Sequence, residues 1–172
     1  MAEGIRIEEL DRDCLDELEP LWNALREHHM AVAGDWLPEM YARNVSWLRR
    51  RDQYASWLEE EGAFVLVARR GPLAVGYAMV HMRGGSPTWQ LGERAGELET
   101  LSVLANERGH GAGRLLLLEV RSRLRDLEAT ELSLHVLCGN EAAERFYERE
   151  GFKSFAVWLT SPVSDPPQDD GG

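Results

Sequence analysis

Residues 106–120 read NERGHGAGRLLLLEV, with three glycines within five positions and a leucine run shortly after them. The preceding residues read as a strand and the leucines as the start of a helix, so the glycines join a strand to a helix. The first-turn N–H groups of such a helix lack internal partners, and the helix dipole adds partial positive charge there. Glycines let the backbone approach an anion closely, and Arg108 and Arg114 flank the loop. The stretch therefore predicts a phosphate cradle, with a purely conformational turn as the alternative.

The spacing of the glycines excludes two familiar phosphate loops. A dinucleotide fingerprint needs G-x-G-x-x-G, but its last position falls on Arg114 when counted from Gly109 and on Leu116 when counted from Gly111. A nucleoside-triphosphate loop ends in Gly-Lys-Ser/Thr, whereas the chain's single lysine is the distant Lys153. A cradle at this helix would thus hold some other phosphate.

Changes in hydrophobic periodicity divide the rest of the chain into helices and strands. Apolar steps of three and four residues predict helices over about residues 11–30, 38–60 (with Pro38 in the first turn) and 113–127. Apolar runs predict strands at 4–10, 96–104 and 131–137 and a hairpin over 63–82. Residues 153–159 close the ordered chain. Strand–helix–strand order in the second half predicts an α/β fold with at least one parallel strand pair.

Length and composition indicate one globular domain with few kinds of partner. The chain has 172 residues and a formal charge of −11, which disfavours binding to nucleic acid or to anionic membranes. No apolar run approaches the roughly 20 residues of a membrane helix, and the first residues do not resemble a signal peptide, so we expect a cytoplasmic protein. Cys14 and Cys138 are far apart and lack partners at metal-ligand spacing, which predicts free thiols and no metal.

A second motif, NEAAERFYEREGF at residues 140–152, predicts a short helix with a functional face. Asn140 stands at a natural N-cap position, and Gly151 is a natural residue for the helix end. Tyr147 follows Asn140 by about two helical turns, so both side chains share one face, whereas Phe146 belongs to the core. A tyrosine hydroxyl opposite an anion cradle would serve as a proton donor; the alternative is a half-buried packing residue.

The two motifs together resemble the GNAT superfamily of acetyl-CoA-dependent N-acetyltransferases. The family's loop signature, Q/R-x-x-G-x-G/A, is filled by Arg108, Gly111 and Gly113, and N-x-x-A-x-x-F-Y-x-x-x-G-F follows after one strand. The resemblance implies a mixed, mostly antiparallel sheet whose central parallel strand pair is splayed to admit acetyl-CoA, flanked by about four helices. It also implies a single domain over residues 1–160, followed by an acidic, proline-rich tail over 161–172 that we expect to be disordered.

The resemblance assigns the coenzyme to two adjoining segments and the second motif. The loop N–H groups of this family hold the pyrophosphate, and the preceding strand lends its backbone to the pantetheine arm. Asn140 matches the family's asparagine near the pantetheine, and Tyr147 matches the tyrosine that protonates the departing thiolate. The implied coenzyme residues before the second motif are Leu101, Ser102, Val103, Arg108, Gly109, His110, Gly111, Ala112, Gly113 and Arg114.

For the catalytic base the resemblance points to carboxylates on the strand before the loop. Several members carry a carboxylate eleven residues before the Q/R position, which is Glu97 here, and Glu99 lies on the same face of the strand. Glu97, Glu99 and a bound water chain stay open as the base, and His81 on the neighbouring strand is a further candidate. The backbone N–H near Leu101 would stabilise the developing oxyanion. A covalent route through Cys138 is the alternative to direct attack of the amine on the thioester.

The acceptor is less defined than the donor. The family's acceptor pocket uses the first two helices, the loop between the third and fourth strands, and the last strands, and Trp36, His81 and Trp89 are candidates for its wall. Aromatic and acidic side chains suit a cation with an apolar portion, so we expect a primary amine on a cationic small molecule. A protein or peptide amine and a non-catalytic acyl-CoA-binding regulatory domain are the alternatives. A homodimer is implied by the family's common habit.

Overall fold

The computed structural model of the protein describes residues 4–34, 38–161 and 163. Its strands are β1 Ile5–Glu9, β2 Phe64–Arg70, β3 Leu73–Gly84, β4 Arg94–Val103 and β5 Glu131–Leu134. Its helices are the 3-10 helices η1 Arg12–Leu18 and η2 Ala105–Glu107 and the α-helices α1 Glu19–Val32, α2 Arg43–Trp57, α3 Ala112–Asp126 and α4 Glu141–Arg149. Within these residues no helix is long and apolar enough to cross a membrane.

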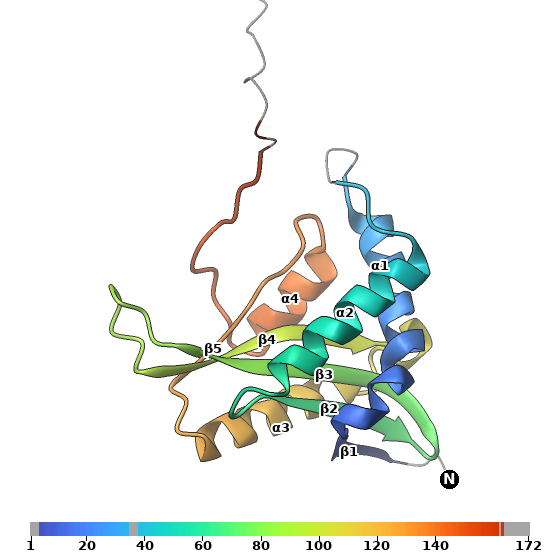
Figure 1. Ribbon diagram of the computed structural model, residues 1–172, viewed down its shortest axis with the longest axis horizontal. Coiled ribbons are helices and arrows are strands. Elements are labelled where there is room, and N and C mark those ends of the chain that lie inside the picture. Colours follow the sequence, from blue (N-terminus) through green and yellow to red (C-terminus); the bar gives the residue numbers. More distant parts are fainter. Residues whose placement is uncertain (1–3, 35–37, 162, 164–172) are drawn as a thin grey trace, which may run out of the picture.

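The five strands form one sheet in chain order, β1-β2-β3-β4-β5. The pairs from β1 to β4 are antiparallel, whereas β4 and β5 run parallel because α3 carries the chain back between them (Figure 1). Among the described residues the fold is therefore α/β, with a mixed, mostly antiparallel sheet and four α-helices around it. The expected α/β architecture is confirmed. The parallel pair, expected at the centre of the sheet, lies at its edge, because no described strand pairs with the far side of β5.

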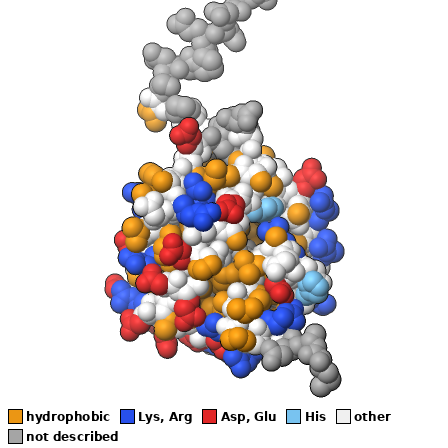
Figure 2. Space-filling view, turned by 90° about the vertical axis from the view of Figure 1, so that its right-hand side faces the viewer, with side chains coloured by type: hydrophobic (Ala, Val, Ile, Leu, Met, Phe, Trp, Pro, Cys, Tyr) orange, Lys and Arg blue, Asp and Glu red, His pale blue; other side chains and the backbone are white. Residues whose placement is uncertain are grey.

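Helices cover both faces of the sheet, because the side chains of its inner strands alternate between two apolar clusters. Phe64 and Leu66 of β2 pack with α3, whereas Val65 between them packs with η1, α1 and α2. Figure 1 shows α1 and α2 along one side of the sheet and α3 along the other. The outer surface is mixed: the face in Figure 2 intersperses acidic and basic side chains around a central band of hydrophobic ones.

A β-bulge interrupts β4 and sets the position of the site. Consecutive residues of β3 pair with Leu98 and Thr100, so Glu99 has no partner on β3. The extra residue reverses the alternation of the strand. Leu98 lies in the apolar cluster under α3. Thr100 lies on the opposite face, where its hydroxyl and the Tyr54 hydroxyl of α2 share a hydrogen bond. Glu99 and Thr100 thus both face α2.

The parallel pair separates at the same bulge. β5 pairs with β4 from Ala95 to Leu98 and then diverges, so residues 100–103 are paired with β3 alone and the bulged Glu99 is paired with neither strand. Among the described residues no strand adjoins the other edge of 99–103, so its backbone groups are available on that side apart from the Val103 carbonyl, which accepts a hydrogen bond from Arg108 Nε. This is the predicted splay of the parallel pair, and it leads directly through η2 to the glycine loop.

Two expected helices start differently from the prediction. The first begins as the 3-10 helix η1 and becomes α-helical only at α1, because Pro20 lacks the N–H of an interior position and suits a first turn. The second, α2, begins at Arg43 rather than at Pro38. The carbonyl of Tyr41 accepts hydrogen bonds from Nε and a terminal nitrogen of Arg26, at 3.1 and 2.7 Å, so it is engaged outside the helix.

The end of the chain also differs from the prediction. β5 stops at Leu134 rather than near residue 137, and residues 153–159 form no strand although they are apolar. Trp158 and Leu159 are 81% and 84% exposed. Two ring contacts connect the segment to the rest of the structure: Phe155 meets Trp89 and Trp158 meets His135. The tail predicted to be disordered lies, apart from residues 161 and 163, outside the described residues.

Candidate active site

The glycine loop takes a conformation that only glycine adopts without strain. Gly109 and Gly111 have φ values of +79° and +89°, and Gly111 is the N-cap residue of α3. No heavy atom lies within 4 Å of the position that a Cβ would take at either residue, so the loop is open on that side. At Gly113 a Cβ would stand 3.5 Å from the Phe146 ring of α4, which is an ordinary contact distance. The loop is therefore both shaped and accessible for a ligand.

The N-terminus of α3 presents free donors to this opening. No side chain caps the helix, and its first internal bond runs from the Leu115 N–H to the Gly111 carbonyl, at 2.9 Å. The N–H groups of Ala112, Gly113 and Arg114 thus precede the hydrogen-bonded turn. Uncapped N–H groups and the helix dipole together favour an anion here.

The two flanking arginines have different roles. Arg108 donates from Nε to the Val103 carbonyl at 3.2 Å, which fixes the loop against the end of β4. Arg114 is 69% exposed and lies 3.8 Å from a carboxylate oxygen of Glu150, so its guanidinium remains accessible. His110 is exposed at the loop tip. Arg114 is the side chain better placed to meet an anion.

Asn140 begins α4 as predicted and is almost fully buried, with 7% exposure. Its Oδ1 accepts a hydrogen bond from the Ala143 N–H at 3.3 Å, and His28 Nε2 of α1 lies 3.4 Å from the same oxygen. Asn140 therefore connects α4 to α1 across the open end of the sheet. Its side-chain oxygen is engaged in this structural role.

Tyr147 lies on α4 in an aromatic group beside the core. Its ring makes edge contacts with Phe146 and Phe152, at centroid distances of 5.2 and 5.4 Å. Phe152 is placed by the end of the helix, where Gly151 has φ +89° and the Phe152 N–H donates to the Tyr147 carbonyl at 2.9 Å. Burial raises the pKa of the Tyr147 hydroxyl well above its usual range. In the described part of the chain this hydroxyl has no hydrogen-bond partner, so it is a proton donor free to meet a ligand.

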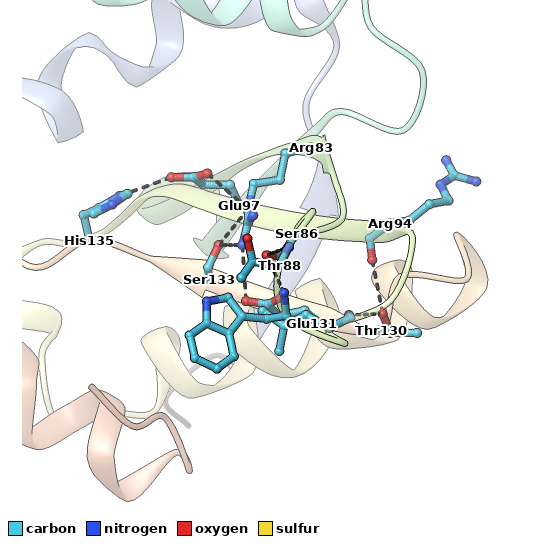
Figure 3. A network of polar contacts seen from close by, with 11 residues as sticks. Arg83, Ser86, Thr88, Arg94, Glu97, Thr130, Glu131, Ser133 and His135 are labelled. Carbon is cyan, nitrogen blue, oxygen red and sulfur yellow. Dashed lines mark hydrogen bonds and ion pairs between the residues drawn. The ribbon is translucent and has the colours of Figure 1, made fainter. Parts of the chain in front are cut away.

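Glu97 on β4 lies between a cation and an imidazole rather than in apolar surroundings (Figure 3). Its Oε1 is 3.1 Å from His135 Nδ1, and its Oε2 is 3.6 Å from Arg83 Nε. Arg83 also reaches Ser133 and Glu131 of β5, at 3.1–3.2 Å from a terminal nitrogen. The cluster therefore bridges β3, β4 and β5 just before the strands separate.

Glu99 is held by a different element from Glu97. Arg50 of α2 forms an ion pair with it, and the Arg50 guanidinium lies 4.7 Å from the Trp22 ring centroid. Below them the Tyr54 hydroxyl is hydrogen-bonded with Thr100 at 2.5 Å and with Tyr77 at 3.1 Å. Glu99 thus belongs to a polar group that fastens α2 to the bulge.

The three candidates for the acceptor pocket have different surroundings. His81 lies opposite Glu97 in the β3–β4 register, but its ring stacks on Trp57 at 4.3 Å with a 6° angle between planes. Trp89 is 60% exposed in the loop between β3 and β4, where residues 86–90, 92 and 93 line a shallow cavity of about 350 Å³. Trp36 lies outside the described residues.

Two members of the cluster, His135 and Arg83, were missed in the sequence. His135 directly follows β5 and its side chain is 65% exposed, but nothing in the sequence places it beside Glu97. The parallel register, in which Glu97 aligns with Ser133, brings them together. A histidine two residues beyond Ser133 was the available signal. Within the described residues no group of three His, Cys, Asp or Glu side chains could hold a metal ion.

A splayed parallel strand pair, an uncapped helix behind a glycine loop and a tyrosine hydroxyl without a hydrogen-bond partner among the described residues define an α/β fold with an open strand edge and an anion site. The model of the Acetyltransferase (GNAT) family matches residues 19–152. The chain belongs to this family, as the two motifs predicted.

Curated relatives are similar over part or most of their length. A mycothiol acetyltransferase of Nocardiopsis dassonvillei is 36% identical over 115 residues, which cover 66% of this chain and 33% of that protein. This chain thus spans about a third of that relative. An uncharacterised N-acetyltransferase of Mycobacterium tuberculosis is 32% identical over 123 residues, covering 72% of this chain and 71% of that protein.

Solved structures share the fold at lower identity. The aminoglycoside N-acetyltransferase AAC(6')-Iy, in complex with CoA, has a TM-score of 0.72 at 15% identity, covering 94% of this chain and 95% of its own. A GCN5-related N-acetyltransferase from Ralstonia eutropha has a TM-score of 0.73 at 17% identity, covering 93% of this chain and 99% of its own. At these identities the likeness establishes the fold alone.

Proposed function

We propose that the protein is an N-acetyltransferase that moves the acetyl group of acetyl-CoA to a primary amine on a cationic small molecule, by direct attack in a ternary complex. The observation that carries the proposal is the free edge of residues 99–103, which starts at the bulge and leads into the uncapped N-terminus of α3. An extended, amide-bearing chain that ends in a pyrophosphate matches this order of backbone edge and anion site.

The residues of this chain fit acetyl-CoA at both ends of that path. The N–H groups around Gly111 and the exposed Arg114 would hold the pyrophosphate, since no atom obstructs the open side of the loop. The free edge at Leu101, Ser102 and Val103 would pair with the pantetheine amides. Bound there, acetyl-CoA supplies an activated acetyl group.

Two groups of the chain would then move protons. The Tyr147 hydroxyl keeps its proton because burial raises its pKa, so it would donate to the departing thiolate. The cluster of Glu97, His135 and Arg83 lies where β4 and β5 separate, and it would accept the proton that the amine must lose. The backbone N–H near Leu101 would stabilise the charge that develops on the carbonyl oxygen.

The acceptor class rests on charge and on the names of similar proteins. A formal charge of −11 attracts cations, and Figure 2 shows that this charge is not gathered into one acidic patch on that face. Similar proteins are named for mycothiol and for aminoglycosides, both small molecules.

A cytoplasmic location and a homodimer stay predictions; the exposed apolar residues 155–159 would be the surface for a second copy.

The test is a panel of amines incubated with acetyl-CoA, with thiol release as the readout and calorimetry for acetyl-CoA binding. We expect binding, and turnover that favours small cationic amines over peptides. Preference for peptide amines would contradict the acceptor class. Tight binding without turnover of any amine would replace the enzyme by a regulatory acyl-CoA-binding domain. Absence of binding would refute the proposal as a whole.

A further inference from the structure

His135 and Glu97 form a pair in which the imidazole is the accessible partner. The Glu97 side chain is 18% exposed and both of its oxygens are engaged, Oε1 by His135 Nδ1 and Oε2 by Arg83. The His135 side chain is 65% exposed at the end of β5, where the parallel strands separate. A small molecule entering that gap would meet the imidazole more readily than the carboxylate behind it.

The chemistry of the pair assigns the proton positions. An ionised carboxylate only accepts hydrogen bonds, so Nδ1 of His135 carries the hydrogen in this contact. In the neutral ring the lone pair is then on Nε2, which has no hydrogen-bond partner among the described residues. A histidine held in this tautomer by a carboxylate is an arrangement suited to general base catalysis.

The other candidate bases near the bulge are committed elsewhere. Glu99 is paired with Arg50 and directed toward α2. His81 is stacked on Trp57. Both contacts hold these side chains in the packing between α2 and the sheet.

The groups around His135 come from several elements. Glu97 of β4 is in direct contact, with Arg83 and His81 of β3 on the far side of that carboxylate. Glu131 of β5, the strand just before His135, is paired with Arg83 rather than with the imidazole. In addition the Trp158 ring contacts the imidazole edge to face, at a centroid distance of 5.5 Å. Glu97 is thus the charged group that contacts His135 directly.

We propose that Nε2 of His135 accepts the proton from the acceptor amine, and that Glu97 is a positioning residue that holds the imidazole and compensates its charge. This assignment rests on the proposed function and names the base within it. It also changes the meaning of Glu97, which the sequence had suggested as a direct base.

A primary ammonium gives one proton to Nε2 of His135 and becomes a neutral amine. Its nitrogen forms the C–N bond to the acetyl carbonyl carbon while the C–S bond breaks. The second nitrogen proton replaces the one that Tyr147 gives to the thiolate, and the imidazolium returns its proton to solvent. One ammonium and one thioester yield one amide, one thiol and one proton.

The experiment compares His135→Ala, His135→Gln and Glu97→Gln in the full chain with an accepted amine. Glu61→Gln is the matched control, because that carboxylate is 91% exposed and remote from the loop and from α4 in sequence. The readouts are acetyl-CoA affinity by calorimetry, kcat against pH, and rescue of kcat by added imidazole. The exposed position of His135 leaves room for imidazole in the alanine variant.

We expect His135→Ala to bind acetyl-CoA normally and to lose kcat by about 10²–10⁴-fold, the usual contribution of general base catalysis. In this variant the fall of kcat toward acidic pH should disappear, and added imidazole should restore turnover. Glu97→Gln should lose less and gain nothing from imidazole. If His135→Ala keeps its turnover and acidic limb while Glu97→Gln loses both, Glu97 is the base and the assignment is wrong. Failure of wild-type protein to turn over any amine would remove the proposed function itself.

Discussion

Replacing Tyr147 by phenylalanine should separate catalysis from stability. The Tyr147 hydroxyl has no hydrogen-bond partner within the described residues, so its loss removes no intramolecular bond. We therefore expect the free energy of unfolding to change by less than about 0.5 kcal/mol, as for a substitution that breaks no hydrogen bond and leaves no cavity. For a chain of this size that corresponds to a shift in Tm of at most about 2 °C. If Tyr147 is the general acid, kcat should nevertheless fall by about 10²–10⁴-fold.

Tyr54→Phe provides the matched control, because the same hydroxyl is removed from a tyrosine with the opposite surroundings. Tyr54 is fully buried and its hydroxyl is bonded with Thr100 and Tyr77. Each hydrogen bond contributes about 0.5–1.5 kcal/mol, so loss of the Tyr54 hydroxyl should lower the free energy of unfolding by about 1–3 kcal/mol. A loss of about 2 kcal/mol lowers Tm by roughly 4–8 °C.

The assays are thermal unfolding and steady-state thiol release at saturating acetyl-CoA. We expect Tyr147→Phe to be stable and nearly inactive, and Tyr54→Phe to be less stable but active at a temperature where it remains folded. Retention of kcat in Tyr147→Phe would refute its role as acid. A parallel loss of stability in both variants would show that Tyr147 is a packing residue whose hydroxyl has a structural role.

Three further predictions concern the positive backbone angle of Gly111, the titration of Tyr54 and the exposed side chain of Trp158. Gly111→Ala should cost about 1–2 kcal/mol of stability, because a Cβ is strained at φ +89°, and should weaken acetyl-CoA binding in calorimetry; Gly113→Ala, in ordinary contact with its neighbours, should be neutral or slightly stabilising. Burial raises the pKa of Tyr54 to about 12, so the native protein keeps a proton that the unfolded chain releases above pH 10. Stability should be full below pH 10 and fall between pH 10 and pH 12 by about 1.4 kcal/mol per pH unit for this residue, as urea titrations would measure; a flat profile would contradict the burial argument. Trp158→Ser should convert a dimer to a monomer in light scattering if residues 155–159 join two copies, and a monomeric wild type would contradict that surface.

The features predicted correctly from the sequence are those with local causes. Gly111 must take a positive φ where a strand turns into a helix, and Asn140 and Gly151 fit the two ends of α4. Each signal lies within a few residues of the structure that it specifies. Together they were enough to identify the family and the order of strands and helices around the loop.

The features that were missed depend on contacts between distant segments. Pro38 looks like a helix start, but Arg26 engages the Tyr41 carbonyl from another helix. His135 meets Glu97 only because α3 returns the chain in one particular register beside β4. Local sequence does not encode that register, so an accessible histidine beside a predicted carboxylate could not be anticipated. Residues 153–159 similarly follow the last helix without a local signal that shows whether a sheet edge would accept them.

The bulge at Glu99 divides β4 into two halves: even-numbered residues before it face α3, whereas odd-numbered residues after it do so. Before it, Leu98 faces α3; after it, Leu101 again joins that cluster, and Ser102 donates to the Leu21 carbonyl of α1 on the other side. Deleting one residue here would exchange the apolar and polar faces of everything that follows in the strand. Insertions and deletions should therefore be tolerated in the β3–β4 loop but not at this position.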